Sequence, residues 1–157
     1  MRVFSFKNWV HYVNGIQVAG FAKGDGVAEF EFPELATHEM GADGQMVVSQ
    51  SADKSMKLVL KLQKASKSNA YLMGLASLER NGPTTFVPIV YSAKDSYRTD
   101  TVVGANGYIT KIPKVSLGST DGEVEWEFQF ERGDMYWADP AFAGLATAVA
   151  EAVRLGL

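Results

Sequence analysis

The chain contains no cysteine, which excludes disulfide bonds, thiolate metal sites and cysteine nucleophiles. It has only two histidines, His11 and His38, and neither lies in an HExxH-type pair that could bind zinc. A GxSxG nucleophile elbow is absent, as is any run of about 18 apolar residues that would span a membrane. We therefore expect no enzymatic activity, no catalytic residues, no metal, no cofactor and no membrane partner.

Positive charge is also scarce. Lysine and arginine number 15 against 18 acidic residues, for a net charge of −3. Proteins that bind nucleic acid through its phosphates need a basic face, so specific DNA binding is not expected. The opening residues lack the apolar core of a signal peptide, and we expect synthesis in the cytoplasm without one. With 157 residues, 46% of them hydrophobic, the chain suits one globular domain.

Turn signals, in contrast, are abundant. Asparagine and aspartate tolerate a positive φ angle and glycine adopts it freely, which the two-residue turns of β-hairpins require. Such pairs occur at Asn14-Gly15, Asp25-Gly26, Asp43-Gly44, Asn106-Gly107 and Asp121-Gly122. These pairs predict a succession of hairpins.

Between these turns, apolar residues often occupy every second position. The pattern is clearest over 56–63 and 124–130 and is repeated briefly over 29–32. One apolar and one polar face is typical of strands in an antiparallel sheet. Further strands are predicted at Val3–Val13, Ile16–Phe21, Gln45–Gln50, Phe86–Ser92 and Tyr108–Leu117. Pro88 and Pro113 indicate edges, bulges or strand ends in the last two. The predicted fold class is mainly β (α+β), an antiparallel β-barrel or sandwich.

A helix is predicted near 68–81, packed on this sheet. Ser68 or Asn69 can cap its start, and Asn81-Gly82-Pro83 supplies a stop. Its apolar stripe at helical spacing consists of Leu72, Leu75, Ala76 and Leu78.

A second helix is predicted near 140–155, as a C-terminal extension that starts at about 139. Asp139 is a suitable N-cap and Pro140 suits the first turn. Phe142, Leu145, Val149 and Val153 recur at helical spacing, so this stripe needs a partner in its own subunit or in a neighbour.

Two segments lack a clear period. Ala93–Val103 is polar and is predicted to be a long loop. Glu34–Ser55 has Asp43-Gly44 at its centre and is predicted to form an extended hairpin arm with a short strand on each side.

The polar face of the 124–130 strand is acidic. Glu125, Glu127 and Glu131 on this strand could be general acid/base carboxylates, since glycosidases use carboxylate pairs. Neighbours on one strand are more often a solvated face that pairs across the sheet with basic residues, here Lys57 and Lys61, and we prefer this interpretation. Trp126 shares the opposite, apolar face and is expected in the core.

Several segments together resemble a family of phage structural proteins. The most specific part is Gly41-Ala42-Asp43-Gly44-Gln45, then Ser49 and Asp53-Lys54-Ser55, the strand Met56–Gln63 and the helix start Ser66-Lys67-Ser68-Asn69. The resemblance begins at Phe4-Ser5-Phe6-Lys7, continues through Val13–Ile16 and Gly20–Asp25, and later includes Tyr108–Pro113, Val115–Leu117 and Glu123–Phe130.

This resemblance implies a subunit of a phage tail tube, similar to the haemolysin-coregulated tube protein of type VI secretion. In such proteins a small antiparallel barrel or sandwich forms stacked rings, usually hexameric, and the inner strands of neighbours join around a channel. The implied partners are other copies and other tail proteins, such as tape measure, sheath or terminator. The implied location is the virion tail, after assembly in the host cytoplasm, and DNA would pass through during genome ejection without specific binding.

Two sets of residues follow from the resemblance. The bridge to the next ring is assigned to the arm, at Met40, Gly41, Asp43, Gly44, Gln45 and Met46. The lumen wall is assigned to Glu29, Glu31, Glu125 and Glu127, because an acidic or mixed polar wall lets DNA pass without sticking. The C-terminal helix is expected to be an addition on the outside of the tube.

Two other interpretations remain open. A secretion-system tube protein would share the architecture and differ in its genome neighbourhood. A small β-barrel that binds an apolar ligand would be a monomer with one deep apolar pocket.

Overall fold

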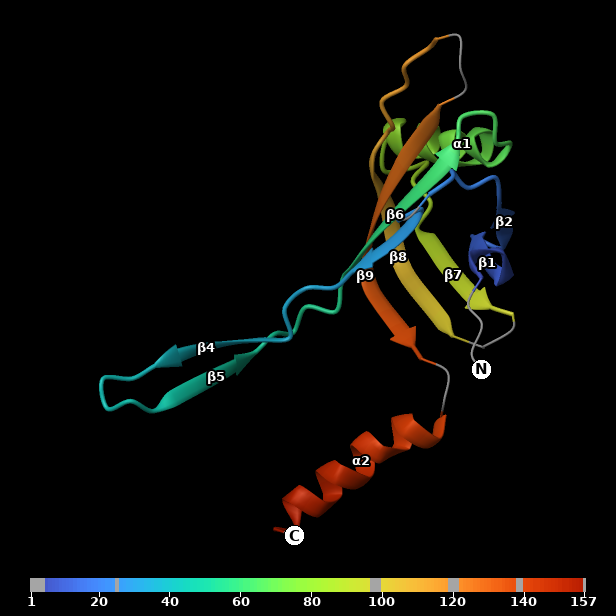
Figure 1. The fold of residues 1–157 in the computed structure, drawn as a ribbon. Helices are drawn as coiled ribbons and strands as arrows, with labels where there is room; N and C mark the ends of the chain where they lie inside the picture. The colour runs from blue at the N-terminus through green and yellow to red at the C-terminus, as the bar shows by residue number, and fades with distance from the viewer. Residues whose placement is uncertain (1–4, 25, 97–99, 119–121, 138–139, 157) are drawn as a thin grey trace.

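The computed structural model describes residues 5–24, 26–96, 100–118, 122–137 and 140–156 (Figure 1). Side-chain environments within α2 are described from Gly144 onward. The elements in chain order are η1 Phe6–Asn8, β1 Trp9–Val13, β2 Ile16–Val18, β3 Ala28–Glu31, β4 Ala36–Met40, β5 Met46–Gln50, β6 Met56–Gln63, α1 Ser68–Arg80, β7 Ile89–Asp95, β8 Thr101–Lys111, β9 Glu123–Tyr136 and α2 Pro140–Arg154.

Seven strands form one antiparallel sheet in the order β2-β1-β7-β8-β9-β6-β3, and β4 and β5 form a separate two-stranded sheet. The large sheet curves over itself. Phe21, which follows β2, bridges Leu62 on β6, and the Ala22 amide donates to the Lys61 carbonyl at 3.0 Å. The architecture is therefore sandwich-like rather than a closed barrel, and the predicted mainly β class with antiparallel strands is confirmed.

The period-two strands supply the core. β6 and β9 pair so that Leu58 faces Phe128 and Leu60 faces Trp126, and all four side chains are buried. Tyr91 of β7 approaches Phe130 with ring centroids 6.1 Å apart, which joins the two halves of the sheet. The apolar face inferred from the alternation is the buried face.

α1 covers one end of the sandwich, as expected for a helix near 68–81 (Figure 1). Three of its side chains bond to the sheet. Asn69 Oδ1 accepts from Trp126 Nε1 at 3.0 Å, Tyr71 donates to the Val13 carbonyl at 3.0 Å, and Glu79 accepts from the Ile109 amide at 3.1 Å.

The predicted caps of α1 are wrong. Neither Ser68 nor Asn69 caps the helix, because both are already inside it. The Ser68 amide instead donates to Ser66 Oγ at 3.2 Å. The stop is as predicted, since the helix ends at Arg80 and Gly82 has a positive φ of 117°.

The predicted turn at Asn106-Gly107 is also wrong. Both residues lie inside β8, where the pairing with β7 shifts register. Asn106 adopts a φ of +52° within this bulge. The tolerance of asparagine for a positive φ, which predicted a turn, is thus used in a β-bulge. A side chain at Gly107 would overlap the Phe130 ring, so glycine also makes room for the core.

Several other predicted bounds need correction, including the end of Ile16–Phe21, which is strand only to Val18, and the start of Phe86–Ser92, which is strand only from Ile89. The loop at Ala93–Val103 is much shorter, because β7 runs to Asp95 and β8 begins at Thr101. Asp95 is buried at the end of β7. Because this core position carries a polar residue, the alternation of apolar and polar residues does not show in the sequence there. Of Val3–Val13, only Trp9–Val13 is strand in the described chain. Tyr108–Leu117 is strand only to Lys111, shortly before Pro113.

The turn at Asn14-Gly15 joins β1 and β2 as predicted, with φ angles of 50° and 82°. Asp25, Asp121 and the proposed cap Asp139 lie outside the described residues.

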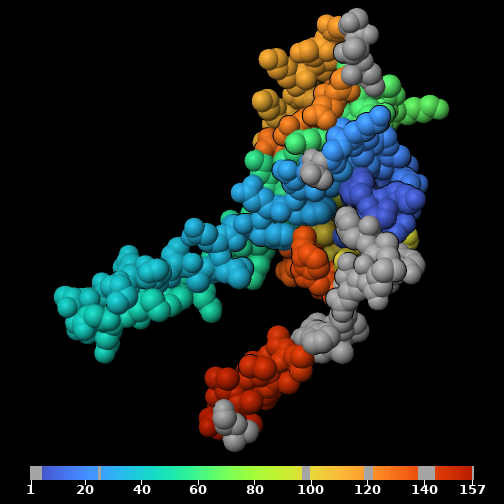
Figure 2. All heavy atoms as spheres, viewed as in Figure 1, coloured from blue at the N-terminus to red at the C-terminus, as the bar shows by residue number. Residues whose placement is uncertain are grey.

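α2 extends away from the sheet (Figures 1 and 2). Its stripe residues Leu145, Val149 and Val153 are 53%, 60% and 70% exposed. Within the described chain, no helix has the length and apolar character needed to cross a membrane.

Candidate functional site

The segment 34–55 forms the predicted extended hairpin. β4 and β5 pair antiparallel, with Met40 opposite Met46 and His38 opposite Val48. Every residue of both strands is exposed. Figures 1 and 2 show the hairpin projecting from the edge of the large sheet where β3 ends and β6 begins.

Short local hydrogen bonds shape the hairpin tip. The Gly41 amide donates to the Gln45 carbonyl at 2.7 Å, and the Gly44 amide donates to the Gly41 carbonyl at 3.0 Å. Asp43 Oδ1 accepts from the Gln45 amide at 3.1 Å, and Gly44 has a φ of +83°. Asp43-Gly44 therefore closes the hairpin, with Met40 and Met46 immediately behind the turn.

The base of the hairpin is also ordered by short bonds. The Ser51 amide donates to the Leu35 carbonyl at 2.9 Å, and the Ser55 amide donates to Asp53 Oδ1 at 2.9 Å. The side-chain and backbone bonds from Ser55 lower the pKa of Asp53, which keeps the acceptor ionised.

The hairpin exposes apolar side chains that contact little of their own subunit. Met40, Met46, Val47 and Val48 are 61%, 58%, 64% and 54% exposed. An isolated two-stranded hairpin is marginally stable in water. The exposed apolar side chains therefore indicate a surface that packs on another molecule.

The second candidate surface is the polar face of β3, β6 and β9. Glu29 and Glu31 of β3 lie opposite Val59 and Lys57 of β6. The predicted lumen residues of β9, Glu125 and Glu127, project from the same side of the sheet as these side chains, because strand pairing keeps the alternation in register. The structure thus brings all four acidic residues to one face.

Lysines interleave with these carboxylates. Lys57 Nζ lies 2.6 Å from Glu127 Oε1, which confirms the expected cross-strand pair. Hydrogen bonding to Glu127, and then the charges of Glu127, Glu31 and Glu125, raise the pKa of Lys57. Lys61 lies directly opposite Glu125 in the register. The face carries both signs of charge.

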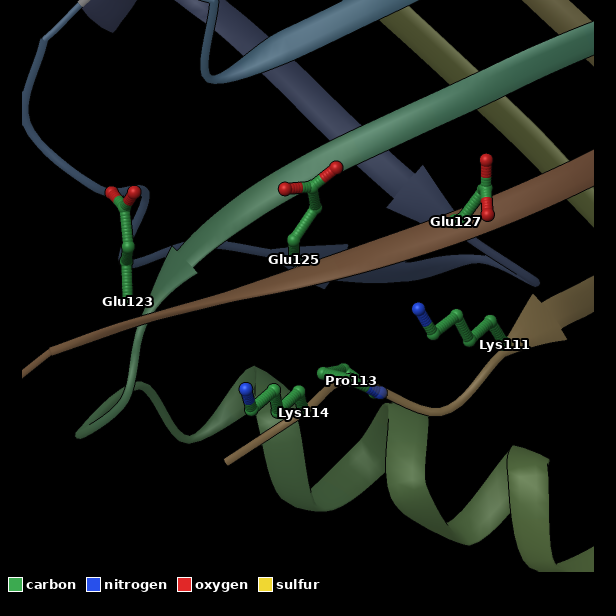
Figure 3. Close-up of a pocket in the computed structure, with 6 residues that line it drawn as sticks. All are labelled: Lys111, Pro113, Lys114, Glu123, Glu125 and Glu127. Atoms are coloured by element: carbon green, nitrogen blue, oxygen red, sulfur yellow. The ribbon is translucent and has the colours of Figure 1, made fainter. Parts of the chain in front are cut away.

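A polar groove of about 310 Å³ runs along the outer part of this face. Figure 3 shows Glu123, Glu125 and Glu127 in a row along β9, with Lys111, Pro113 and Lys114 facing them from the end of β8 and the segment after it. This row is a charged surface, and among the described residues no group of three or more His, Cys, Asp or Glu side chains could hold a metal ion.

His11 lies in the core, which agrees with a structural role, and His38 is exposed on the arm. His11 Nδ1 bonds to the Tyr91 hydroxyl. Burial lowers the pKa of His11 to about 4 and raises that of Tyr91. Both groups are therefore neutral at pH 7, and the hydrogen-bonded pair forms part of the packed core.

Sequence reasoning missed an apolar cavity, here called the aromatic cavity. It has a volume of about 190 Å³ and is lined by residues at the start of β1, the start of β8 and the end of β9, together with Phe30 of β3. Its lining consists mostly of apolar residues, joined by the polar residues Asp100 and Thr101: the apolar ones are Trp9, Phe30, Val102, Met135, Tyr136 and Trp137. Trp137 is 74% exposed. The alternation of β9 could not predict this exposure, because Trp137 follows the last residue of the strand.

The sequence matches the family model described as the bacteriophage PhiTE tail tube protein over residues 9–136. No curated protein matches it. Two solved structures share its fold. The anti-feeding prophage cap, a tube terminating cap, aligns with a TM-score of 0.56 at 9% identity over 88% of this chain and 93% of that one. The sheath/tube terminator of the PVC extracellular contractile injection system, in its extended state, aligns with a TM-score of 0.57 at 10% identity over 87% and 98%.

Proposed function

Because the chain belongs to the bacteriophage PhiTE tail tube protein family and is a tail structural protein, we propose that its copies form closed rings, six to a ring, that stack into a hollow tube for genome delivery. The observation that carries this proposal is the hairpin arm, whose every strand residue is exposed although several are apolar. In this proposal the protein acts without catalysis, in the virion tail, after assembly in the host cytoplasm.

Sheet edges provide the ring contacts. Among the described strands, β2 pairs only with β1, and β3 pairs only with β6. Each therefore presents unpaired backbone groups that can bind the strand of a neighbouring copy. Edge-to-edge pairing of this kind would continue the sheet around a ring, and the arm would then contact the next ring.

The polar face of β3, β6 and β9 would line the channel. Glu29, Glu31, Glu125 and Glu127 repel phosphate at short range, while the interleaved Lys57 and Lys61 keep the local field small. A wall of mixed charge offers DNA no continuous basic surface to bind.

A tube terminator is the second candidate function. Two of the solved structures that share the fold are a tube terminating cap and a sheath/tube terminator. A terminator would form single rings that end a tube, in contact with sheath or other tail proteins, whereas a tube subunit would polymerise.

The ligand-binding alternative receives less support from the geometry. The aromatic cavity measures about 190 Å³, below the range of about 300–1,000 Å³ for small-molecule pockets. A secretion-system tube protein stays distinguishable by its neighbouring genes, which would encode a secretion ATPase and membrane complex in place of a tape measure.

Negative-stain electron microscopy of the purified protein at micromolar concentration, with light scattering, tests the proposal. We expect rings and stacked tubes. Single rings that never stack would favour the terminator, and a strict monomer at high concentration would contradict both.

A further inference from the structure

We propose that the aromatic cavity is the receptor for the hairpin tip of a second copy, with Met40 and Met46 as the inserted side chains. This inference rests on the proposed function, because it names the contact through which the arm would join subunits. In this contact the aromatic cavity of one copy and the hairpin tip of another copy are each other's binding partners.

The cavity has the chemistry of a side-chain receptor. Trp9 from β1, Phe30 from β3 and Tyr136 from β9 contribute rings from three strands that are far apart in the sequence. Tyr136 and Trp137 are 60% and 74% exposed at its rim, so aromatic surface is open to a partner. A volume of about 190 Å³ far exceeds the share of a water molecule, about 30 Å³, but falls short of a typical small-molecule pocket.

The hairpin tip has the matching shape. Met40 and Met46 are direct cross-strand partners behind the turn, so their Cβ atoms lie about 5 Å apart on one side of the hairpin. Both side chains are more than half exposed. Methionine is flexible, fills irregular cavities and forms favourable contacts between its sulfur and aromatic rings. A compact methionine pair therefore suits a small cavity with aromatic walls.

The two surfaces do not meet within one copy. Figures 1 and 2 show the arm extending away from the body of the sheet, with its tip at the far end. The occupant must therefore come from another chain, and a second copy presents the tip at the same concentration as the cavity.

The apolar stripe of α2 is the main competing occupant. Leu145, Val149 and Val153 are exposed, but the first and last of them are eight positions apart, or about 12 Å along a helix. A stripe of that length requires a groove, whereas the cavity is compact. Occupation of the cavity by α2 of a neighbouring copy is therefore the alternative that the cross-linking experiment below distinguishes.

Because the chain has no cysteine, pairs of single cysteine variants can report this contact without background. Met40→Cys and Tyr136→Cys would be purified separately, one with a larger tag, mixed in excess wild-type protein and oxidised under assembly conditions. A disulfide requires Cα atoms within about 7 Å. We expect a mixed dimer, identified by mass spectrometry as a linkage between positions 40 and 136, at least tenfold above the yield from Glu39→Cys, whose side chain points to the other side of the hairpin.

The outcomes separate the two proposals. A linkage between 136 and 145 from Leu145→Cys, without one between 40 and 136, would assign the cavity to α2 and overturn the inference. Tubes that assemble normally without any linkage between 40 and 136 would also overturn it while leaving the proposed function intact. Absence of rings and tubes in the wild-type protein would overturn the proposed function itself.

Discussion

Trp126 joins the sheet to the helix that covers it. Its ring is 1% exposed on β9, and its indole nitrogen donates to Asn69 of α1. The residue therefore contributes both apolar burial and a hydrogen bond that positions α1. Glu127, the next residue, faces the opposite side and pairs with Lys57, so adjacent positions have separate roles.

We predict that Trp126→Ala lowers the free energy of unfolding by about 3–5 kcal/mol, as large aromatic truncations in cores do. Glu127→Gln should lower it by less than about 1 kcal/mol, because a partly exposed ion pair contributes little. Urea denaturation followed by circular dichroism measures both. The opposite order would mean that the buried face of β9 has been misassigned.

His11 makes the stability of the core dependent on pH. Burial lowers its pKa to about 4 in the folded state, whereas an unfolded histidine titrates near about 6.5. Between these values the unfolded chain binds more protons, so the free energy of unfolding falls as the pH falls.

We predict a loss on the order of 3 kcal/mol between about pH 6.5 and pH 4 from this residue. The measurement is urea denaturation at a series of pH values. His11→Asn, which cannot be protonated there, should show a shallower fall over the same range. An unchanged slope in this variant would show that other groups cause the pH dependence.

At the scale of elements, the arm is a hairpin that forms a sheet of its own, separate from the seven-stranded sheet. Its strands bond only to each other, and its side chains are exposed. Its tight turn and exposed methionines are therefore better explained by a contact outside the subunit than by the stability of the subunit.

We predict that deletion of Glu39–Val47 leaves the sheet folded and abolishes tube growth. Circular dichroism would establish the folding, and electron microscopy of the same sample would measure the assembly. Thr37→Ala, a change near the arm's base that keeps the tip, serves as the matched control and should still assemble. Long tubes from the folded deletion variant would refute the bridging role.

On the scale of the whole molecule, the chain consists of a sheet body with two projecting parts, the arm and α2 (Figure 2). The family match ends at residue 136, immediately before the segment that leads to α2. We propose that the body is one domain and that α2 is an addition to it.

We predict that truncation after Trp137 changes the free energy of unfolding of the body by less than about 0.5 kcal/mol, as expected for a change confined to an exposed surface. Thermal unfolding followed by the intrinsic fluorescence of the tryptophans, all three of which the truncated chain retains, would measure it. A large loss would show that α2 packs on the body in solution. Retention of rings in the truncated protein would place α2 outside the contacts that close them.

Local sequence determined much of the architecture. The alternation over Met56–Gln63 indicated which side chains are buried, because a strand has a strict period of two. Asn14-Gly15 and Asp43-Gly44 determined two hairpins, because few other residues accept the positive φ of their turns. The hairpin arm could thus be predicted from turn chemistry between two short strand-like runs.

Tertiary structure decided the features that depend on strand order and register. Asn106-Gly107 became a bulge because the pairing of β8 with β7 and the Phe130 ring determine the backbone there. Glu29 and Glu125 share a face because β6 lies between their strands. The aromatic cavity assembles residues as distant in sequence as Trp9 and Trp137. Such features arise from nonlocal contacts, whose free energy depends on the whole packed sheet, whereas turn and alternation signals arise from backbone sterics within a few residues.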